Sequence, residues 1–304
     1  MIDVSVCICT FRRPAGVLRL LRSLRSLDPS TPRHEIIVVD NEAGSTAEPS
    51  IRQVRAEGLE VQYVVEPVRG IARARNRSLE RATGEYVAFI DDDEEAAPRW
   101  LVDLWGEVVR AGADGGVGPV IPRFSDGAPR WLIEGGFCER PRTATGTILR
   151  AKETRTGNAL IRRRLLMALP GPFDERYNFS GGEDSDLFAR LIDGGHRFIA
   201  VDSAIVYEHL TPARTTVRWL LRRRFLGSMG AARLDSAGAP VRGARWRSAR
   251  PLAAAVAWGA LGLLLFPALR VHGFDRLSRG AQQLGRFAFL NGLSYRPYLD
   301  DSWR

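Results

Sequence analysis

The stretch "GEYVAFIDDDEEAAPRW", residues 84–100, sets a short apolar run against five consecutive acidic residues, in a chain of 304 residues with a formal net charge of +9. The apolar run has the length and composition of a buried strand, and the acids begin where that strand would end. Adjacent carboxylates raise one another's pKa, so three aspartates in a row are easier to explain if a cation sits on them. In an extended chain Asp91 and Asp93 project to one side and Asp92 to the other, which lets two carboxylates converge on a divalent cation. A solvated acidic loop is the alternative.

Apolar runs of the same kind recur elsewhere, and helical patterns separate them. Residues 2–9, "HEIIVVDN" (34–41) and "VQYVVE" (61–66) read as further strands. Strands that alternate with helices predict a mostly parallel α/β sheet, and helices on both faces explain why the strands are apolar throughout. In such sheets ligands bind beyond the carboxyl ends of the strands. The polar residues expected at those ends are Thr10 to Arg13, Asp40, Asn41, Glu66 and Asp91 to Asp93.

A second acidic group lies far along the chain, in "NFSGGEDSDLFARLIDGG" (178–195). The two glycines permit unusual dihedral angles, and a helix is expected to begin after them. Glu183 and Asp184 then fall in its first turn, where the helix dipole favours charged carboxylates. A positioned carboxylate can act as general base for a hydroxyl. The alternative is an ordinary capping box of Ser180 with Glu183.

The last third of the chain is basic and apolar rather than α/β in pattern. Residues 251–269, "PLAAAVAWGALGLLLFPAL", carry no charge and come close to the length that spans a bilayer. Three interpretations stay open: a single membrane pass, an interfacial or re-entrant segment interrupted by Gly259, Gly262 and Pro267, or a buried helix. The amphipathic stretch 215–234 before it is rich in arginine.

The positive charge comes from arginine, since Lys152 is the only lysine. Arginine suits phosphates and acidic surfaces, although a coding bias toward arginine explains the composition equally well. The arginines are spread along the chain, and no helix-turn-helix, zinc or RNA-binding signature accompanies them. Nucleic acid is therefore not an expected partner.

These motifs, taken in order, resemble those of family 2 glycosyltransferases with the GT-A fold. The resemblance rests on "VSVCICTFRRP", "EIIVVDN", "GIARARNRSLERATGEYVAFIDDD", "TGNALIRR" and "GGEDSDLFARLIDGGHRF", and it covers roughly residues 3–212. The tail beyond residue 213 is similar, more loosely, to that of bacterial exopolysaccharide glycosyltransferases. The implied fold is a Rossmann-like GT-A domain with a mostly parallel sheet, followed by a helical segment that associates with membranes.

The resemblance implies a donor site for a nucleoside-diphosphate sugar, with a UDP-sugar favoured. The positions that hold the nucleotide base lie within the first hundred residues, as does the segment that closes over the base and the phosphates. One position that lines the sugar pocket lies further along the chain. The implied donor-binding residues are Thr10, Phe11, Arg13, Asp40, Gly70, Arg73, Arg75, Asp91, Asp92 and Asn158.

The resemblance also implies a divalent cation, Mn²⁺ or Mg²⁺, and a catalytic base. Asp91 and Asp93 match the metal-binding DxD motif, and His209 falls where some relatives place a third metal ligand. A lone histidine after a strand is otherwise a structural residue. Asp184 matches the general base, with Glu183 beside it. Displacement of the nucleotide by an acceptor hydroxyl would invert the sugar's configuration.

The expected organisation is a catalytic domain over residues 1–212 and a helical, membrane-associated region over residues 213–304. Within the domain, residues 1–115 form the nucleotide-sugar half and residues 116–212 the acceptor half. The acceptor implied by the family is a saccharide, often lipid-linked, at the cytoplasmic face of the bacterial inner membrane, where anionic lipid attracts basic segments.

Two other functions compete with this one. A sugar nucleotidyltransferase also uses a metal on an α/β sheet, but its phosphate loop is usually rich in glycine and lysine, whereas "CTFRRPAG" has one glycine and no lysine. A catalytically inert sugar-nucleotide-binding scaffold would not need a carboxylate base opposite the metal.

Overall fold

The computed structural model describes residues 2–235 and 245–293. The chain divides into two compact units, the first made of Met1–Arg123 and Arg140–His209 and the second of Phe124–Glu139 and Leu210–Arg304. The short segment 124–139 thus belongs with the tail, although its sequence lies inside the expected acceptor half. Residues 236–244 and 294–304 of the expected helical tail lie outside the described residues.

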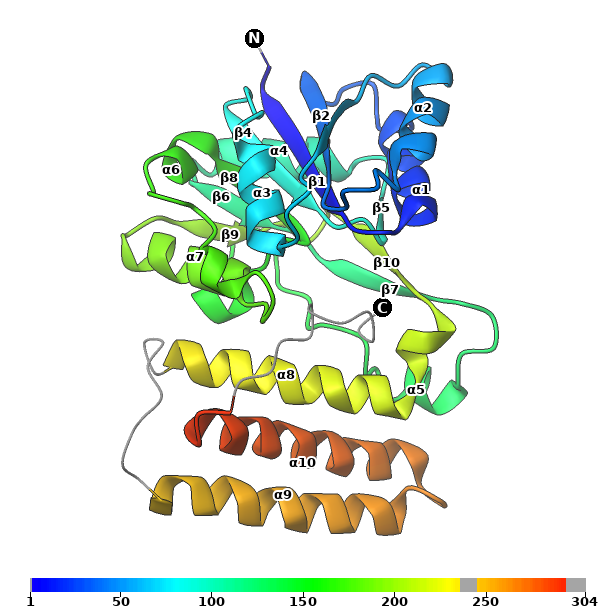
Figure 1. Cartoon of the computed structure of the whole chain (residues 1–304), viewed down its shortest axis with the longest axis vertical. Coiled ribbons are helices and arrows are strands. Elements are labelled where there is room, and N and C mark those ends of the chain that lie inside the picture. Colours follow the sequence, from blue (N-terminus) through cyan, green and yellow to red (C-terminus); the bar gives the residue numbers. More distant parts are fainter. Residues whose placement is uncertain (1, 236–244, 294–304) are drawn as a thin grey trace. The chain divides into compact units, whose positions relative to one another are not determined.

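A seven-stranded sheet forms the centre of the first unit (Figure 1). All neighbouring strands run parallel except β8, which is antiparallel to both of its neighbours. The expected α/β fold with a mostly parallel sheet is confirmed. The strand order is β3 (Gln62–Val65), β2 (His34–Asp40), β1 (Val4–Thr10), β4 (Tyr86–Ile90), β8 (Asn158–Arg162), β6 (Gly115–Val117) and β9 (Phe198–Ala200).

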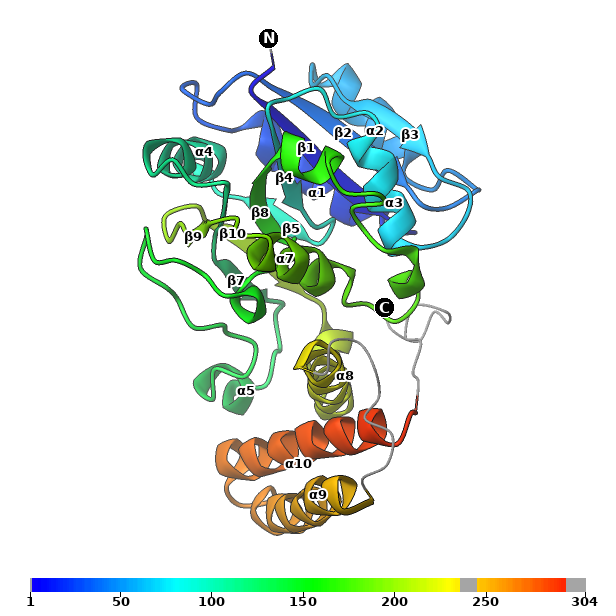
Figure 2. The same cartoon turned by 90° about the vertical axis from the view of Figure 1, so that its left-hand side faces the viewer.

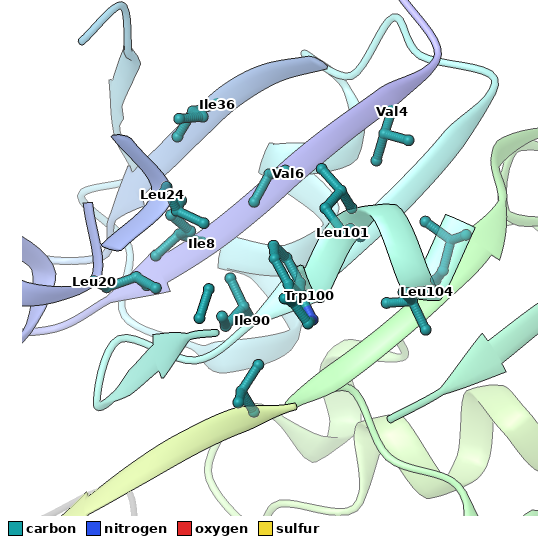
Figure 3. Packing of buried hydrophobic residues seen from close by; sticks show 14 of the residues in the cluster. Val4, Val6, Ile8, Leu20, Leu24, Ile36, Ile90, Trp100, Leu101 and Leu104 are labelled. Atoms are coloured by element: carbon teal, nitrogen blue, oxygen red, sulfur yellow. The ribbon is translucent and has the colours of Figure 1, made fainter. Parts of the chain in front are cut away.

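Helices cover both faces of this sheet, as the uniformly apolar strands predict. Val4, Val6 and Ile8 of β1 face one apolar cluster, which contains side chains of α1 (Pro14–Arg25), α2 (Glu48–Ala56) and α4 (Trp100–Arg110) (Figure 3). Cys7 faces the opposite cluster because side chains alternate along a strand. Figure 2 shows α3 and α4 on opposite sides of the sheet. The second cluster includes α3 (Ile71–Leu79), α6 (Arg163–Met167) and α7 (Glu183–Asp193).

A second, three-stranded sheet has the order β5 (Glu94–Ala96), β10 (Val206–Leu210) and β7 (Val120–Phe124). The acidic run is therefore not a loop throughout: the three aspartates form a tight turn, and Glu94 begins a new strand. The apolar stretch 196–209, which reads as one strand, divides into β9 and β10 around a turn. The short 3₁₀ helices are η1 (Ala151–Glu153), η2 (Glu175–Tyr177) and η3 (Pro212–Thr215).

The second unit is helical, with α5 (Arg130–Glu134), α8 (Val217–Asp235), α9 (Arg245–Leu265) and α10 (Arg270–Leu290). α10 lies between α8 and α9 (Figure 1), and glycines allow the close packing. A Cβ on Gly262 would lie 2.7 Å from the Leu277 backbone, and one on Gly285 would lie 2.3 Å from the Phe225 carbonyl oxygen. The apolar stretch 251–269 is split between α9 and the turn that contains Pro267. Within residues 2–235 and 245–293, no helix combines the length and the apolar character needed to cross a membrane.

Candidate active site

The acidic turn is fixed from the neighbouring strand. Because β1 and β4 are parallel neighbours, Thr10 at the end of β1 lies beside the turn that follows β4. Asp92 points inward, is 6% exposed, and accepts hydrogen bonds from Thr10 Oγ1 (2.8 Å) and Arg13 Nη1 (2.9 Å). Arg13 also donates to Asp93 (3.0 Å). In this state Thr10, Arg13 and Asp92 build the turn, rather than presenting free polar atoms to a nucleotide.

Asp91 remains open on one side, and its charge is incompletely compensated. The enclosure of the turn raises the pKa of Asp91 to about 6; Arg75 lowers it, and Asp93 and Asp92 raise it further. The backbone N–H of Asp91 donates to Glu94 Oε2 (2.9 Å), and Glu94 is itself 3% exposed. Burial raises the pKa of Glu94 well above its ordinary value. The turn therefore carries more negative charge than its protein partners balance.

Arg75 joins this turn to the distant acids of α7. Its guanidinium is buried, contacts Glu183 and lies 3.5 Å from Asp91 Oδ1. Burial raises the pKa of Glu183 to about 7; Arg75 lowers it, while Asp184 adds to the rise. The second oxygen of Glu183 is buried without a hydrogen-bond partner among the described residues. One arginine thus serves several carboxylates, and residues 91 and 183 belong to one site.

Two glycines direct the acids of α7. Gly181 and Gly182 have φ of +71° and +96°, a region that favours glycine, and Gly182 is the N-cap of α7. No side chain caps this helix, so the capping box of Ser180 with Glu183 does not form. Asp184 is half-buried, and its Oδ1 accepts the N–H of Ser185 (2.7 Å). The glycine pair therefore shapes the turn before the acids, as the sequence predicted.

Asp40 lies buried at the end of β2 with one oxygen in use. Its Oδ2 accepts the Ala47 N–H (2.8 Å) and the Tyr63 hydroxyl (2.9 Å), while Oδ1 is buried and has no partner among the described residues. A buried acceptor without a donor is costly unless a ligand supplies one. Tyr63 was not predicted, because its contact depends on the pairing of β2 with β3.

The segment around Gly70 is held by two asparagines. Gly70 N–H donates to Asn41 Oδ1 (2.7 Å), and a Cβ on Gly70 would lie 2.4 Å from the Asn178 side chain. Asn178 Oδ1 also accepts the Arg73 N–H (3.0 Å), while the Arg73 side chain pairs with Glu175 at the surface. Gly70 is required by close packing, and the Arg73 guanidinium is occupied by Glu175. Asn178 is a positioning residue that sequence reasoning missed.

Phe11 follows β1 and carries the guanidinium of Arg69 over its ring, 4.5 Å from the centroid. An aromatic ring at a strand end beside Asp40 and Asn41 offers a stacking surface for a planar base. The backbone connects these positions, since the Asn41 N–H donates to the Thr10 carbonyl (2.8 Å).

Two predicted residues are committed to other partners. Asn158 has no exposed surface: its Oδ1 accepts Trp100 Nε1–H (2.8 Å), and its Nδ2 donates to the Pro119 (3.0 Å) and Ala204 (2.7 Å) carbonyls. A direct sugar contact would require these bonds to break. His209 Nε2 is 2.8 Å from Glu95 Oε2, because β10 pairs with β5.

A divalent cation fits the acidic turn, although with fewer ligands than predicted. Among the described residues, no three His, Cys, Asp or Glu side chains are grouped to hold a metal, and His209 lies against Glu95, so a third ligand at His209 stays a prediction. Asp91 and Asp93 still offer hard oxygen atoms, and the raised pKa of Asp91 indicates missing positive charge. Two protein carboxylates are compatible with a cation that takes its other ligands from phosphates and water.

The family assignment follows from this fold together with the sequence. Residues 5–169 match the family described as glycosyl transferase family 2. The chain belongs to this family. The expected resemblance is therefore confirmed.

Similar proteins agree with the assignment. The glycosyltransferase chain is 34% identical over 238 residues to succinoglycan biosynthesis protein ExoM of Rhizobium meliloti (strain 1021), covering 77% of this chain and 75% of that protein. It is 27% identical over 247 residues to the glucosyl-dolichyl phosphate glucuronosyltransferase of Haloferax volcanii, covering 73% and 74%.

Solved structures share the fold at lower identity. The mannosyltransferase PcManGT from Pyrobaculum calidifontis, in complex with GDP-Man and Mn²⁺, gives a TM-score of 0.62 at 20% identity over 93% of this chain and 85% of that one. S. aureus TarS 1–349 in complex with UDP gives 0.56 at 18% identity over 97% and 93%. These are GT-A glycosyltransferases, and the likeness concerns the fold.

Proposed function

We propose that this protein is an inverting glycosyltransferase of bacterial polysaccharide synthesis, which transfers a sugar from a nucleoside-diphosphate sugar to a hydroxyl of a saccharide acceptor. The observation that carries the proposal is the Arg75 bridge, which unites the acids after β4 with those of α7 in one site. Support comes from ExoM, named for succinoglycan biosynthesis, and from structures of the same fold that hold UDP, GDP-Man and Mn²⁺. A lipid-linked acceptor belongs to the same proposal.

The nucleotide end of the site lies at β1 and β2. The free Oδ1 of Asp40 is suited to accept an imide N–H of a uracil-like base, which favours a UDP-sugar. Phe11 offers its ring to the base, and the backbone at Gly70 packs closely against the Asn178 side chain because Gly70 has no side chain of its own.

Asp184 acts as the general base in this proposal. Its carboxylate takes the proton of the acceptor hydroxyl, whose oxygen bonds to the anomeric carbon as the bond to the diphosphate breaks. One displacement inverts the configuration, and the bonding electron pair leaves with the diphosphate. Glu183 and Arg75 position Asp184 beside the acidic turn.

Asp91 and Asp93 would hold a divalent cation, Mn²⁺ or Mg²⁺. When bound, such an ion neutralises negative charge that develops on the leaving phosphate. For its part, the chain keeps Asp92 and Arg13 locked together, so that the carboxylates on either side of Asp92 stay at the turn's surface.

Incubation with a panel of nucleotide sugars tests the proposal against its competitors. A glycosyltransferase releases free nucleoside diphosphate, and its sugar product has inverted anomeric configuration by NMR. Consumption of added pyrophosphate, with release of nucleoside triphosphate and sugar 1-phosphate, would identify a nucleotidyltransferase. Nucleotide-sugar binding without any turnover, across the panel and with both metals, would identify a scaffold.

We further propose that α9 docks the protein on an anionic membrane surface at the cytoplasmic face. The exposed face of α9 carries Leu252, Val256 and Leu263, whose spacing of four and seven residues aligns them along the helix. Leu263 and Leu264 are 69% and 76% exposed. An apolar face of this kind suits the boundary between headgroups and acyl chains. Arg276 and Arg279, which flank Trp258, add cationic groups that attract anionic lipid.

Vesicle co-sedimentation of the full-length protein tests the docking. Val256→Asp should lower the bound fraction on phosphatidylglycerol-containing vesicles by about tenfold, since it places a charge in the apolar face. Val109→Asp, at an exposed position of α4, is the matched control and should bind like the wild type. Equal binding of all three proteins would contradict membrane docking through α9.

A further inference from the structure

A cavity of about 410 Å³ opens in the first unit beyond the carboxyl ends of β6 and β9. Its wall includes Val117 at the end of β6, Gly118 directly after it and Val201 after β9. The site derived above does not use this cavity. Its charged lining consists of Arg140, Arg142, Lys152, Arg155, Glu153 and Asp202.

The basic residues of this cavity outnumber the available acids. Asp202 is taken by Arg142, whose Nε lies 2.7 Å from Oδ1. Glu153 is taken by Arg150, which lies outside the lining. Within the described part of the chain, Arg140, Lys152 and Arg155 are therefore left without a carboxylate partner. Three cations converge on one cavity.

Arg155 is held in an arrangement that is unfavourable without an anion. One Nη2–H donates to the Gly118 carbonyl (3.2 Å), while Nε is buried and has no partner among the described residues. Burial lowers the pKa of Arg155 to about 10, and Arg140 lowers it further, although the carboxylates of Glu94 and Asp184 oppose the shift. Burying a guanidinium beside a second one costs free energy that a bound anion would return.

The cavity adjoins the catalytic acids. Gly157, two residues after Arg155, packs against Asp91 and Glu94, because a Cβ there would lie 3.0 Å from Asp91 Oδ2 and 3.0 Å from Glu94 Oε1. Asp184 acts on the charge of Arg155. A ligand in the cavity therefore lies on the side of the proposed base rather than at the nucleotide end near Asp40.

We propose that this cavity binds an oxyanion, a phosphate or a carboxylate, carried by the acceptor saccharide. The inference rests on the proposed glycosyltransferase function and names the chemical class of its acceptor. The planar forks of Arg140 and Arg155 suit bidentate contact with an oxyanion, and Lys152 adds a mobile charge at the rim. Neutral saccharides lack the group that completes this cavity, so the site selects against them.

Calorimetric titration of the full-length protein, with UDP and Mn²⁺ present, tests the proposal. The probes are glucose 1-phosphate and glucuronate, which distinguish a phosphate from a carboxylate, and neutral glucose. Each anionic sugar that fits should bind at least about tenfold more tightly than glucose, the ratio expected for one charge-assisted hydrogen bond. Equal affinity for all three sugars, or competition of the anionic sugar with UDP, overturns the proposal.

Charge removal provides the second arm. Lys152 is exposed. Lys152→Gln, and the double variant that combines it with Arg140→Gln, should each weaken binding of the anionic sugar and leave the affinity for glucose unchanged. Arg110→Gln removes the same charge from a surface ion pair with Glu107 and is the matched control. If the variants bind the anionic sugar as tightly as the control does, the proposal is wrong.

Chemical protection of Lys152, the only lysine of the chain, is a third test and needs no variant. Bound anionic sugar should slow acetylation of Lys152, read by peptide mass spectrometry, whereas glucose should not. Failure of UDP to bind in the titration would contradict the proposed function. The comparison of anionic with neutral sugars, repeated without UDP, would still test whether the cavity binds an oxyanion.

Discussion

The acidic turn after β4 and the cationic cavity beyond β6 adjoin each other, since Gly157, two residues after Arg155, packs against Asp91, yet they hold opposite charge. Asp91 and Glu94 at the turn, and Glu183 of α7 beside it, share too few cations. In the cavity, Arg155 lacks a carboxylate among the described residues. Direct ion pairs between the acids of the turn and the cations of the cavity would have balanced the charge of both regions, but the fold keeps these groups apart. Strongly perturbed groups that stay unpaired in this way are typical of sites completed by ligands.

Replacing the proposed base gives the largest expected effect. Asp184→Asn removes the proton acceptor and should lower the rate of transfer by about 10²–10⁴-fold, with nucleotide binding retained. The measurement is release of nucleoside diphosphate with acceptor present.

Asp186→Asn is the matched control, because Asp186 lies in the same turn of α7 and pairs with Arg190 (2.9 Å). Activity of Asp184→Asn near that of the control would remove Asp184 from the chemistry, and the acidic turn would then have no partner across the site.

Asn158 begins β8, three residues after Arg155 of the cavity, and β8 pairs with β4 before the acidic turn. Replacing Asn158 tests whether this residue contacts the sugar or only supports the sheet. Asn158→Ala leaves the Trp100 N–H and the Ala204 carbonyl without these partners, while the Pro119 carbonyl still accepts the Val206 N–H (3.2 Å). Denaturant unfolding should show a loss of about 2–4 kcal/mol, given roughly 1–3 kcal/mol for each such group. A raised Michaelis constant for the donor with unchanged stability would instead restore the sugar contact predicted from the sequence.

Metal affinity tests whether the excess negative charge of the acidic turn serves to bind a cation. Asp91→Asn removes one charged ligand and should weaken Mn²⁺ binding in the presence of UDP by about tenfold or more, measured by calorimetry. Glu95→Gln alters the same acidic run, but Glu95 is occupied by His209 and Arg123, so this variant should bind Mn²⁺ like the wild type. A larger loss of Mn²⁺ affinity in Glu95→Gln than in Asp91→Asn would place the cation on the β5 side of the turn.

The features that local sequence predicts well are those set by strand period and strand ends. The buried runs before Thr10, Asp40 and Asp91 become β1, β2 and β4 because their apolar composition suits a sheet covered on both faces. The glycine pair before Glu183 requires positive φ and marks the turn directly. Each of these signals resides in a few adjacent residues.

The features that the sequence could not predict depend on contacts between distant segments. Pairing of β5 with β10 brings Glu95 to His209, a contact that no local pattern around the histidine indicates. The antiparallel β8 buries Asn158 against Trp100. The cationic cavity joins residues near 118, 140 and 155, and nothing in any one segment indicates that the others lie beside it.

The smallest expected effect concerns Glu183, which connects the acidic turn to α7. Its pKa is about 7 in the folded protein and near 4.5 in the unfolded chain, so the folded state binds more protons between these values. Stability therefore falls as pH rises from about 4.5 to 7. Glu183→Gln lacks this titration and should gain about 1 kcal/mol relative to the wild type between pH 5.5 and pH 6.5, because one pH unit in this window is worth about 1.4 kcal/mol. Glu175→Gln, at an exposed pair with Arg73, changes the net charge equally and is the control for melting temperatures measured at both pH values. If Glu183→Gln instead loses stability against the wild type as pH rises, Arg75 fully compensates Glu183, and the surplus of negative charge is confined to the turn.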